Sequence, residues 1–298
     1  MQTLHGLLIY NGGLRTEKFI SNEDRFVRAA TSRGIHLTKV ANDDLLVMTA
    51  GPTHIAASTP FTHPDFIFFA DKDISLAQAL ESQGIPVYNS AHSIATCDNK
   101  NTMHQVLHKH QIPTPTTILA PKRYHHTTPT YLHTIVKTIG LPLIVKEAYG
   151  SFGQQVYFVE TLEELERIAE KLSSVEHLYQ EAIVESLGND LRLNVVGDRV
   201  VASMKRHSTT DFRANITAGG SAEVYSPTQA EQDLAIAAAK ACGTDFAGVD
   251  LLQTNNGPVI CEVNSNPHLQ SIFDCTGVEV EYDMIDHIIQ TRERRTNA

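Results

Sequence analysis

The sequence lacks the features that would place it in a membrane or in an oxidising compartment. No apolar run approaches the roughly 18 residues that a membrane-spanning helix needs. The apolar start, residues 4–10, is too short for the core of a secretory signal with its cleavage site, and we predict a strand there. The four cysteines form no CxxC pair, which fits reduced thiols. We therefore expect a cytoplasmic protein that does not bind membranes.

Basic residues are also fewer than acidic ones. The chain has 24 lysines and arginines against 34 aspartates and glutamates, which gives a net charge of −10. Proteins that bind nucleic acid in general need a basic face, so this balance argues against that class of function.

The first third of the chain alternates between apolar strands and amphipathic helices. At 298 residues the chain is long enough for two or three domains. Strands separated by helices indicate a parallel sheet, and we predict an N-terminal Rossmann-like domain over residues 1–97. Its expected elements are strands at 7–10, 36–40, 66–69 and 86–88 and helices at 21–33 and 74–82.

The rest of the chain mixes helices with antiparallel strand pairs. Asp98 is predicted to cap a helix that runs to about His110. Strands near residues 145 and 157, followed by a helix with a capping box at Thr161-Leu162-Glu163-Glu164, form a small α+β unit. The predicted fold class is therefore α/β followed by α+β, with a small central domain over residues 98–183 and a C-terminal domain over residues 184–298.

A hairpin signal, Thr254-Asn255-Asn256-Gly257, carries the clearest chemical pattern. If residues 255–257 form the loop, Asp250 lies directly across from Glu262 with both side chains on one face. Asn264 shares that face. Two carboxylates and an amide oxygen at a sheet end suit magnesium, although solvated acids on an edge strand would give the same pattern.

Gly197-Asp198 predicts a second hairpin. One face of it is apolar, and the other presents ions and hydrogen-bonding groups. With the turn centred on these two residues, the polar face pairs Asp190 with Lys205, Arg192 with Ser203 and Asn194 with Val201.

Lys146 ends a predicted strand just before the loop Gly150-Ser151-Phe152-Gly153. This order differs from a Walker A motif, in which the lysine follows the glycines. A strand lysine supplies a point charge and the loop supplies backbone N–H groups, so together they could hold phosphates. On its own, the pattern is more typical of a flexible surface hairpin.

Other candidates have ordinary structural interpretations. His104 and His108 are one helical turn apart and could chelate zinc, but no third ligand is apparent, so we expect a solvated helix face. Cys261 is expected to be a core thiol. Asp71-Lys72-Asp73 follows a buried strand at the sheet edge where α/β proteins bind ligands. Contact with a carboxylate substrate and a charge cluster at a helix start both remain open for this run.

The order of the motifs is more specific than any motif alone. Asp98-Asn99-Lys100 opens a helix, and Lys146 with its glycine-containing loop comes next. The segments that follow are Gln180-Glu181-Ala182-Ile183, Asp190-Leu191-Arg192, residues 195–202, Arg206, Asp211-Phe212-Arg213-Ala214-Asn215, Gly219-Gly220, Asp250 and Glu262-Val263-Asn264. Over about residues 60–290 this order resembles the ATP-grasp superfamily and, within it, the RimK-like amino-acid ligases.

The resemblance implies an ATP-grasp fold with a central lid domain, and a role for each matching residue. For ATP, the resemblance implies that Lys100 and Lys146 contact the phosphates, that the loop with Gly150, Ser151 and Gly153 closes over them, that Glu181 and Ile183 contact adenine and that Asp190 contacts the ribose. It implies that the metal ligands are Asp250, Glu262 and Asn264. It also implies that the γ-phosphate and the acyl phosphate are contacted by Arg206, Arg213 and Asn215.

The resemblance also implies the reaction. Such ligases move the γ-phosphoryl group of ATP to a carboxylate, and an amine then attacks the acyl phosphate to give an amide, ADP and phosphate. The implied cofactors are ATP and magnesium or manganese, in two ions. The implied partners are an amino acid such as glutamate, an amine or carboxylate acceptor, and further copies of the chain in a dimer or tetramer.

Two other functions fit the same motifs. One is a kinase that stops after phosphoryl transfer, and the other is a non-catalytic nucleotide-binding protein. The chain departs from the family at His268, where many relatives carry glycine after the proline. His268 could contact the acceptor or simply fill space.

Overall fold

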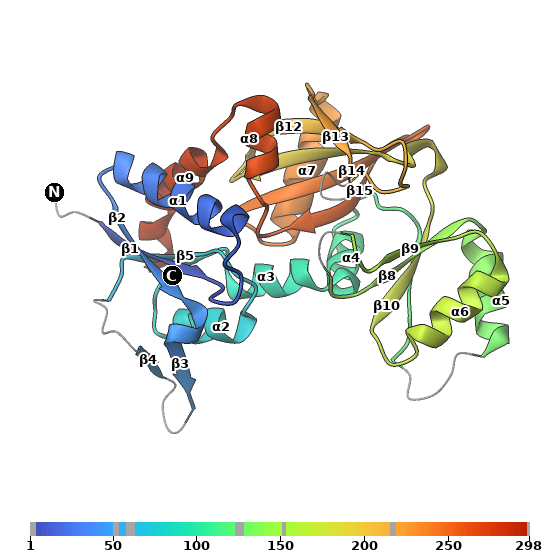
Figure 1. The fold of residues 1–298 in the computed structure, drawn as a ribbon, viewed down its shortest axis with the longest axis horizontal. Coiled ribbons are helices and arrows are strands. Elements are labelled where there is room, and N and C mark those ends of the chain that lie inside the picture. Colours follow the sequence, from blue (N-terminus) through green and yellow to red (C-terminus); the bar gives the residue numbers. More distant parts are fainter. Residues whose placement is uncertain are drawn as a thin grey trace.

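The computed structural model describes residues 4–49, 54–57, 63–122, 128–150, 153–214 and 219–296. Three sheets with their helices follow one another along the chain, as Figure 1 shows. The N-terminal sheet lies on the left of that view, the C-terminal sheet at the top and the central sheet on the right. Within the described residues, no helix is both long and apolar enough to cross a bilayer.

The first sheet has four parallel strands in the order β2-β1-β5-β6, which confirms the predicted α/β start. Its middle strands are buried on both faces, which explains their continuous apolar runs. Helices α2 and α3 cover one face, and α1 with the C-terminal helix α9 cover the other. The elements are β1 His5–Tyr10, α1 Glu17–Ser32, β2 His36–Ala41, β5 Phe66–Phe69, α2 Ile74–Ser82, β6 Val87–Tyr88, α3 Ala91–Asp98 and α9 Val280–Thr296.

A short turn and a two-stranded hairpin leave this sheet after β2, and neither was predicted. They comprise η1 Asn42–Asp44, β3 Leu45–Met48 and β4 His54–Ala57. The prediction that Asp98 caps the next helix is wrong, because Asp98 is the last residue of α3. Asn99 caps α4 (Lys100–Lys109) instead, and its side chain accepts a hydrogen bond from the Thr102 backbone.

The central sheet is antiparallel, in the order β7-β10-β8-β9, and α5 and α6 pack on one face of it. Thr161 caps α6 as predicted, because its side chain accepts a hydrogen bond from the Glu164 backbone. The elements are β7 Thr117–Leu119, α5 Pro129–Ile139, β8 Leu143–Glu147, β9 Val156–Val159, α6 Leu162–Lys171, β10 His177–Glu181 and η2 Val184–Ser186.

The C-terminal sheet is antiparallel as well, in the order β13-β12-β11-β14-β15. Helices α4 and α7 bury one of its faces, and Thr228 and Glu231 form a capping box at the start of α7. The elements are β11 Asn189–Val196, β12 Arg199–His207, β13 Ser221–Val224, α7 Gln229–Ala241, β14 Phe246–Thr254, β15 Gly257–Asn264 and α8 Gln270–Thr276.

Two buried polar contacts fix the N-terminal sheet against the C-terminal one. The Asn89 side chain donates to the backbone oxygens of Phe246 and Ser265, at 2.9 and 2.6 Å. Arg25 of α1 forms a buried ion pair with Glu281 of α9, at 2.9 Å, and α9 also packs against β11 and β12 of the C-terminal sheet. Buried polar groups need such partners, so these contacts hold the two sheets in one relative position.

Candidate active site

A cavity of about 690 Å³ lies where the three sheets meet and is lined by residues of all three. This volume is in the range of pockets that hold small-molecule substrates. Ser151 and Asn215 lie outside the described residues. The predicted site residues that line the cavity are Lys100, Lys146, Gly150, Gly153, Glu181, Ile183, Asp190, Arg206, Arg213, Asp250, Glu262 and Asn264.

The β14–β15 hairpin pairs Asp250 with Glu262, as predicted, but for a different reason. Thr254 pairs with Gly257, so the loop has two residues rather than the predicted three. The register then shifts between Asp250 and Leu251, because Cys261 is an extra residue on β15. The shorter loop and the bulge compensate each other, and the two carboxylates stay opposite.

The predicted pairing of the β11–β12 hairpin is wrong for its polar residues. The turn is where we expected it, but the register shifts between Asn194 and Val195. Asp190 therefore pairs with Arg206 rather than with Lys205. This shift lets Arg206 donate two hydrogen bonds to the Asp190 carboxylate, at 2.6 and 2.7 Å.

Arg192 is a cavity residue to which the sequence analysis gave no role. Arg192 lies on β11, directly across from Asp250 on the neighbouring strand β14. Its side chain donates hydrogen bonds to both oxygens of the Asp250 carboxylate. The Arg206 guanidinium also reaches Asp250, at 3.0 Å. The spacing in the sequence could have identified Arg192 as a site residue. It lies two residues after Asp190, so both side chains are on the same face of the strand.

The result is a row of alternating charges across three strands: Arg206, Asp190, Arg192 and Asp250. Burial by itself would raise the pKa of Asp250, but Arg192 and Arg206 outweigh it and hold that pKa below its usual value. Burial raises the pKa of Asp190, with a smaller contribution from nearby Asp250, although Arg206 opposes it. The pKa of Arg206 is raised, because the two carboxylates outweigh its burial. The Arg206 guanidinium therefore stays charged at the wall of the cavity.

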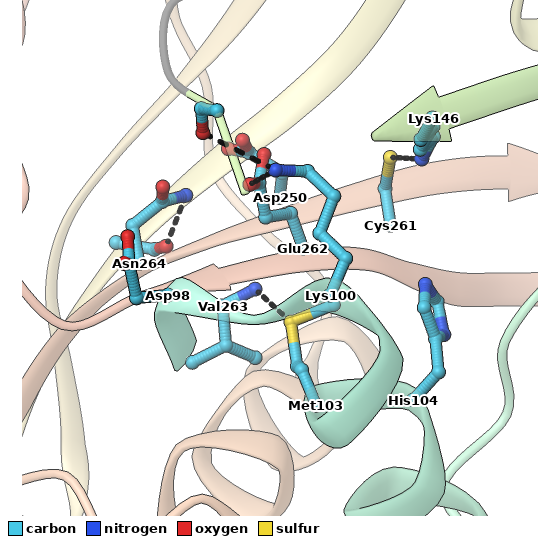
Figure 2. A network of polar contacts seen from close by, with 12 residues as sticks. Asp98, Lys100, Met103, His104, Lys146, Asp250, Cys261, Glu262, Val263 and Asn264 are labelled. Atoms are coloured by element: carbon cyan, nitrogen blue, oxygen red, sulfur yellow. Dashed lines mark hydrogen bonds and ion pairs between the residues drawn. The ribbon is translucent and has the colours of Figure 1, made fainter. Parts of the chain in front are cut away.

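Asp250, Glu262 and Asn264 bring three side-chain oxygen ligands to the cavity wall (Figure 2). Asn264 donates through its amide nitrogen to the Gly248 carbonyl oxygen at 3.3 Å, which leaves its amide oxygen to act as an acceptor. The Lys100 ammonium lies 3.4 Å from Glu262, so this position already attracts a cation. Hard oxygen ligands of this kind fit a divalent metal ion.

Histidine and cysteine play no part in that set of ligands. Among the described residues, no group of three His, Cys, Asp or Glu side chains is placed to hold a metal. A site here therefore depends on the Asn264 amide as its third ligand.

Lys146 is buried at the end of β8, and its ammonium lies 3.5 Å from the Cys261 sulfur. Figure 2 shows the two side chains facing each other. The prediction of a core thiol for Cys261 is wrong, because the bulge turns this residue toward the cavity that it helps to line. Burial raises the pKa of the Cys261 thiol, so it is a neutral neighbour of the lysine.

The glycine-containing loop is held at both of its described ends. Lys100 donates to the Gly150 carbonyl oxygen at 3.3 Å. Arg213 donates to the Gly153 carbonyl oxygen and to both oxygens of Asp211. The described ends of the loop thus contact one predicted phosphate-binding lysine, Lys100, and one predicted catalytic arginine, Arg213.

The candidate residues Asp71, Lys72, Asp73 and His268 make different contacts in the structure. Asp73 caps α2. Lys72 forms an ion pair with Asp98 at 2.6 Å and also lines the cavity. Asp71 is buried and lines the cavity. His268 also lines the cavity, and its ring meets Phe19 edge to face at 5.7 Å.

The prediction of a solvated helix face is correct for His108 and wrong for His104. His104 is only 4% exposed, because α4 packs against β10, and its ring accepts a hydrogen bond from the Gln180 amide at 3.2 Å. Burial lowers the pKa of His104 to about 3, and the charges of Lys146 and Lys100 add to the shift. The buried imidazole is therefore neutral at pH 7.

Acid is expected to destabilise the protein through His104. The unfolded chain takes up a proton near pH 6.5 and the folded chain does not, so the free energy of unfolding falls as the pH drops from 6.5 toward 3. At pH 4.5 the loss from this residue is about 3 kcal/mol. Denaturant unfolding of His104→Gln at pH 7 and pH 4.5 should show a smaller loss than wild type, whereas His108→Gln should follow wild type. Equal losses in all three proteins would contradict the prediction.

Comparison with known proteins agrees with this geometry. A family model described as a RimK-like ATP-grasp domain matches residues 97–288. A probable alpha-L-glutamate ligase of Shewanella sp. is 36% identical over 246 residues, which cover 81% of this chain and 79% of that one. A second, from Methanococcoides burtonii, is 38% identical over 218 residues, which cover 72% of this chain and 70% of that one.

Solved structures show the same fold. A RimK-domain ATP-grasp protein from Sphaerobacter thermophilus matches with a TM-score of 0.72 at 21% identity, over 95% of this chain and 98% of that one. The VanG D-Ala:D-Ser ligase of Enterococcus faecalis matches with a TM-score of 0.76 at 19% identity, over 98% of this chain and all of the other. The chain therefore belongs to the RimK-like ATP-grasp family and is an ATP-dependent carboxylate–amine ligase.

Proposed function

We propose that this ligase uses glutamate as its amino-acid substrate and joins it to a small-molecule, peptide or protein acceptor through an acyl phosphate. The observation that carries the proposal is that the two lysines, the arginines and the three oxygen ligands line one cavity. The relatives named as probable alpha-L-glutamate ligases support glutamate. Part of the cavity extends past these groups toward the N-terminal sheet, which leaves room for substrates that a nucleotide sensor would not need.

In this proposal ATP lies with its adenine beside Glu181 and Ile183, its ribose near Asp190 and its phosphates toward Lys100 and Lys146. The lysines contribute positive charge to the phosphate oxygens. Arg206 is held rigidly by its carboxylate partners, so it can contact the γ-phosphate and the acyl phosphate without losing side-chain freedom. Phosphoryl transfer depends mainly on such positioning and charge neutralisation.

The residues fit a divalent metal, with Asp250, Glu262 and Asn264 as the ligands, and we propose magnesium or manganese in two ions. When bound, these ions would neutralise phosphate charge. The Asp250 carboxylate is held by Arg192 and Arg206, so it is fixed in place before any ligand arrives.

The acyl phosphate must be kept from water until the amine attacks it. The loop that ends at Gly150 and Gly153 is placed to do this, because Lys100 and Arg213 hold its two described ends over the cavity. Lys100 and Arg213 would therefore act on both the phosphates and the closed loop.

The test is ADP release from purified protein with ATP and magnesium, against amino acids and acceptors given singly and in pairs. The proposal expects release that rises only when glutamate and one acceptor are both present. Release with a single hydroxyl compound, and no amide product, would support a kinase instead. Release with another amino acid would retain the ligase and replace glutamate.

We also propose a cytoplasmic homo-oligomer, a dimer or a tetramer. Support comes from the β3–β4 hairpin, which exposes three apolar side chains in a row: Leu46 (62% exposed), Val47 (38%) and Met48 (36%). Leu45 and Ile55 anchor the hairpin on the core of the N-terminal domain, and contact with another copy would cover the three outer side chains. Sedimentation equilibrium of the purified protein tests the oligomeric state.

A further inference from the structure

Three polar side chains meet at the carboxyl edge of the N-terminal sheet. Asn11, Asn42 and Asp71 follow the ends of β1, β2 and β5, either directly or one residue later, and these strands are neighbours in the sheet. Ligands of open α/β sheets bind at this edge. Asn11 and Asp71 line the cavity that also holds the proposed ATP site.

The two asparagines hold the Asp71 carboxylate in one orientation. The Asn42 amide donates to it at 2.9 Å, and the Asn11 amide donates to its two oxygens at 3.2 and 3.4 Å. Asn42 is itself fixed, because its oxygen accepts a hydrogen bond from the Gly12 backbone at 3.0 Å. A carboxylate has about four acceptor positions, so these three hydrogen bonds leave one free on a residue that lines the cavity.

Asp71 is only 7% exposed, and within the described part of the chain it forms no ion pair. Buried carboxylates normally have a cationic partner, because desolvating an unpaired charge is costly. The other acidic residues in this part of the cavity are either paired with a cation or exposed to water, unlike Asp71. Glu23 is paired with Arg15 and Lys39, and Asp274 is exposed to water.

The site lies close to the proposed chemistry. Lys72, the next residue, borders a small hollow with Lys100, Glu262 and Asn264. Asp71 and Lys72 both line the cavity that Lys100, Glu262 and Asn264 also line. A group bound by Asp71 would be held within the same cavity as the γ-phosphate.

We propose that Asp71 binds the ammonium group of the amino-acid substrate, with Asn11 and Asn42 as the residues that position it. The missing counter-ion is then supplied by the substrate. A primary ammonium group has three donors, and it can use the acceptor position that the asparagines leave free. This inference rests on the proposed amino-acid ligase function and adds to it the residue that selects an amino acid over a deaminated analogue.

The test compares wild type with Asp71→Asn, using the amino acid that supports ADP release and its 2-hydroxy analogue as a competitive inhibitor; for glutamate this is 2-hydroxyglutarate. The KM for the amino acid should rise by about 10- to 100-fold in the variant, since a hydrogen bond to a charged group is lost. The preference of wild type for the amino acid over the hydroxy analogue should shrink by a similar factor. The KM for ATP should stay the same.

Two further measurements separate this role from a structural one. The Tm of Asp71→Asn without substrate should change little, because removal of the unpaired buried charge offsets the hydrogen bond that the new amide nitrogen cannot accept from the asparagines. Asp73→Ala is the control, since Asp73 caps α2 and does not line the cavity, and alanine cannot accept the capping hydrogen bond. Its Tm should fall while its KM for the amino acid is unchanged.

The outcomes distinguish this inference from the function on which it rests. No ADP release by wild type with any amino acid would overturn both. Release by wild type, with an unchanged KM and unchanged discrimination in Asp71→Asn, would overturn the role of Asp71 alone.

Discussion

Replacing Arg213 with alanine is expected to lower kcat by roughly 1,000-fold, which is the size of effect seen when an arginine that stabilises a transferring phosphoryl group is lost. The affinity for ATP should change by less than about tenfold, because the proposed contact forms mainly in the transition state. The structure adds a reason to expect a large effect on kcat and a small one on ATP affinity. Arg213 donates to the Gly153 carbonyl oxygen, so the variant loses both the charge and a contact with the described end of the loop.

Steady-state kinetics and the Kd of a non-hydrolysable ATP analogue measure the two quantities. Arg199→Ala is the matched control, since Arg199 pairs with Asp283 on the surface with 61% of its side chain exposed. That variant should keep wild-type kcat. If Arg213→Ala lost ATP affinity and kcat to the same extent, the residue would be a binding residue and the assigned role would fail.

The two β-hairpins show how far a sequence pattern determines a site. Alternation of apolar and polar residues correctly predicted which face of β11 carries Asp190, Arg192 and Asn194, because burial imposes a period of two. It did not predict which residues lie opposite them. The cross-strand pairing depends on β-bulges at Val201 and Cys261. A sequence does not reveal such a bulge, because the bulged residue need not be of any particular type.

The Asp71 site shows a different limit. The sequence placed Asp71 at the end of a strand, but Asn11 and Asn42 lie 60 and 29 residues earlier in the chain. Only the strand order β2-β1-β5 brings the three together. His104 was misjudged for a similar reason, because its burial comes from contact between α4 and the central sheet, which the helix pattern does not reveal.

Replacing Glu262 with glutamine is expected to lower kcat at least 100-fold at low magnesium. A bound divalent ion stabilises transition-state charge by several kcal/mol, and about 2.7 kcal/mol corresponds to a factor of 100 in rate. Glutamine keeps the size of the side chain and one oxygen but loses the charge that attracts the ion. Part of the lost activity should therefore return as magnesium is raised.

A second explanation must be excluded, because the Lys100 ammonium lies 3.4 Å from Glu262. If Glu262 served only to position Lys100, its loss would weaken phosphate binding equally at every magnesium concentration. Titrating magnesium at saturating ATP separates the two, since only a metal ligand raises the half-saturating concentration. Glu223→Gln, on the exposed strand β13, is the matched control and should titrate like wild type. A half-saturating concentration in Glu262→Gln equal to that of wild type would assign Glu262 to Lys100 and leave Asp250 and Asn264 as the metal ligands.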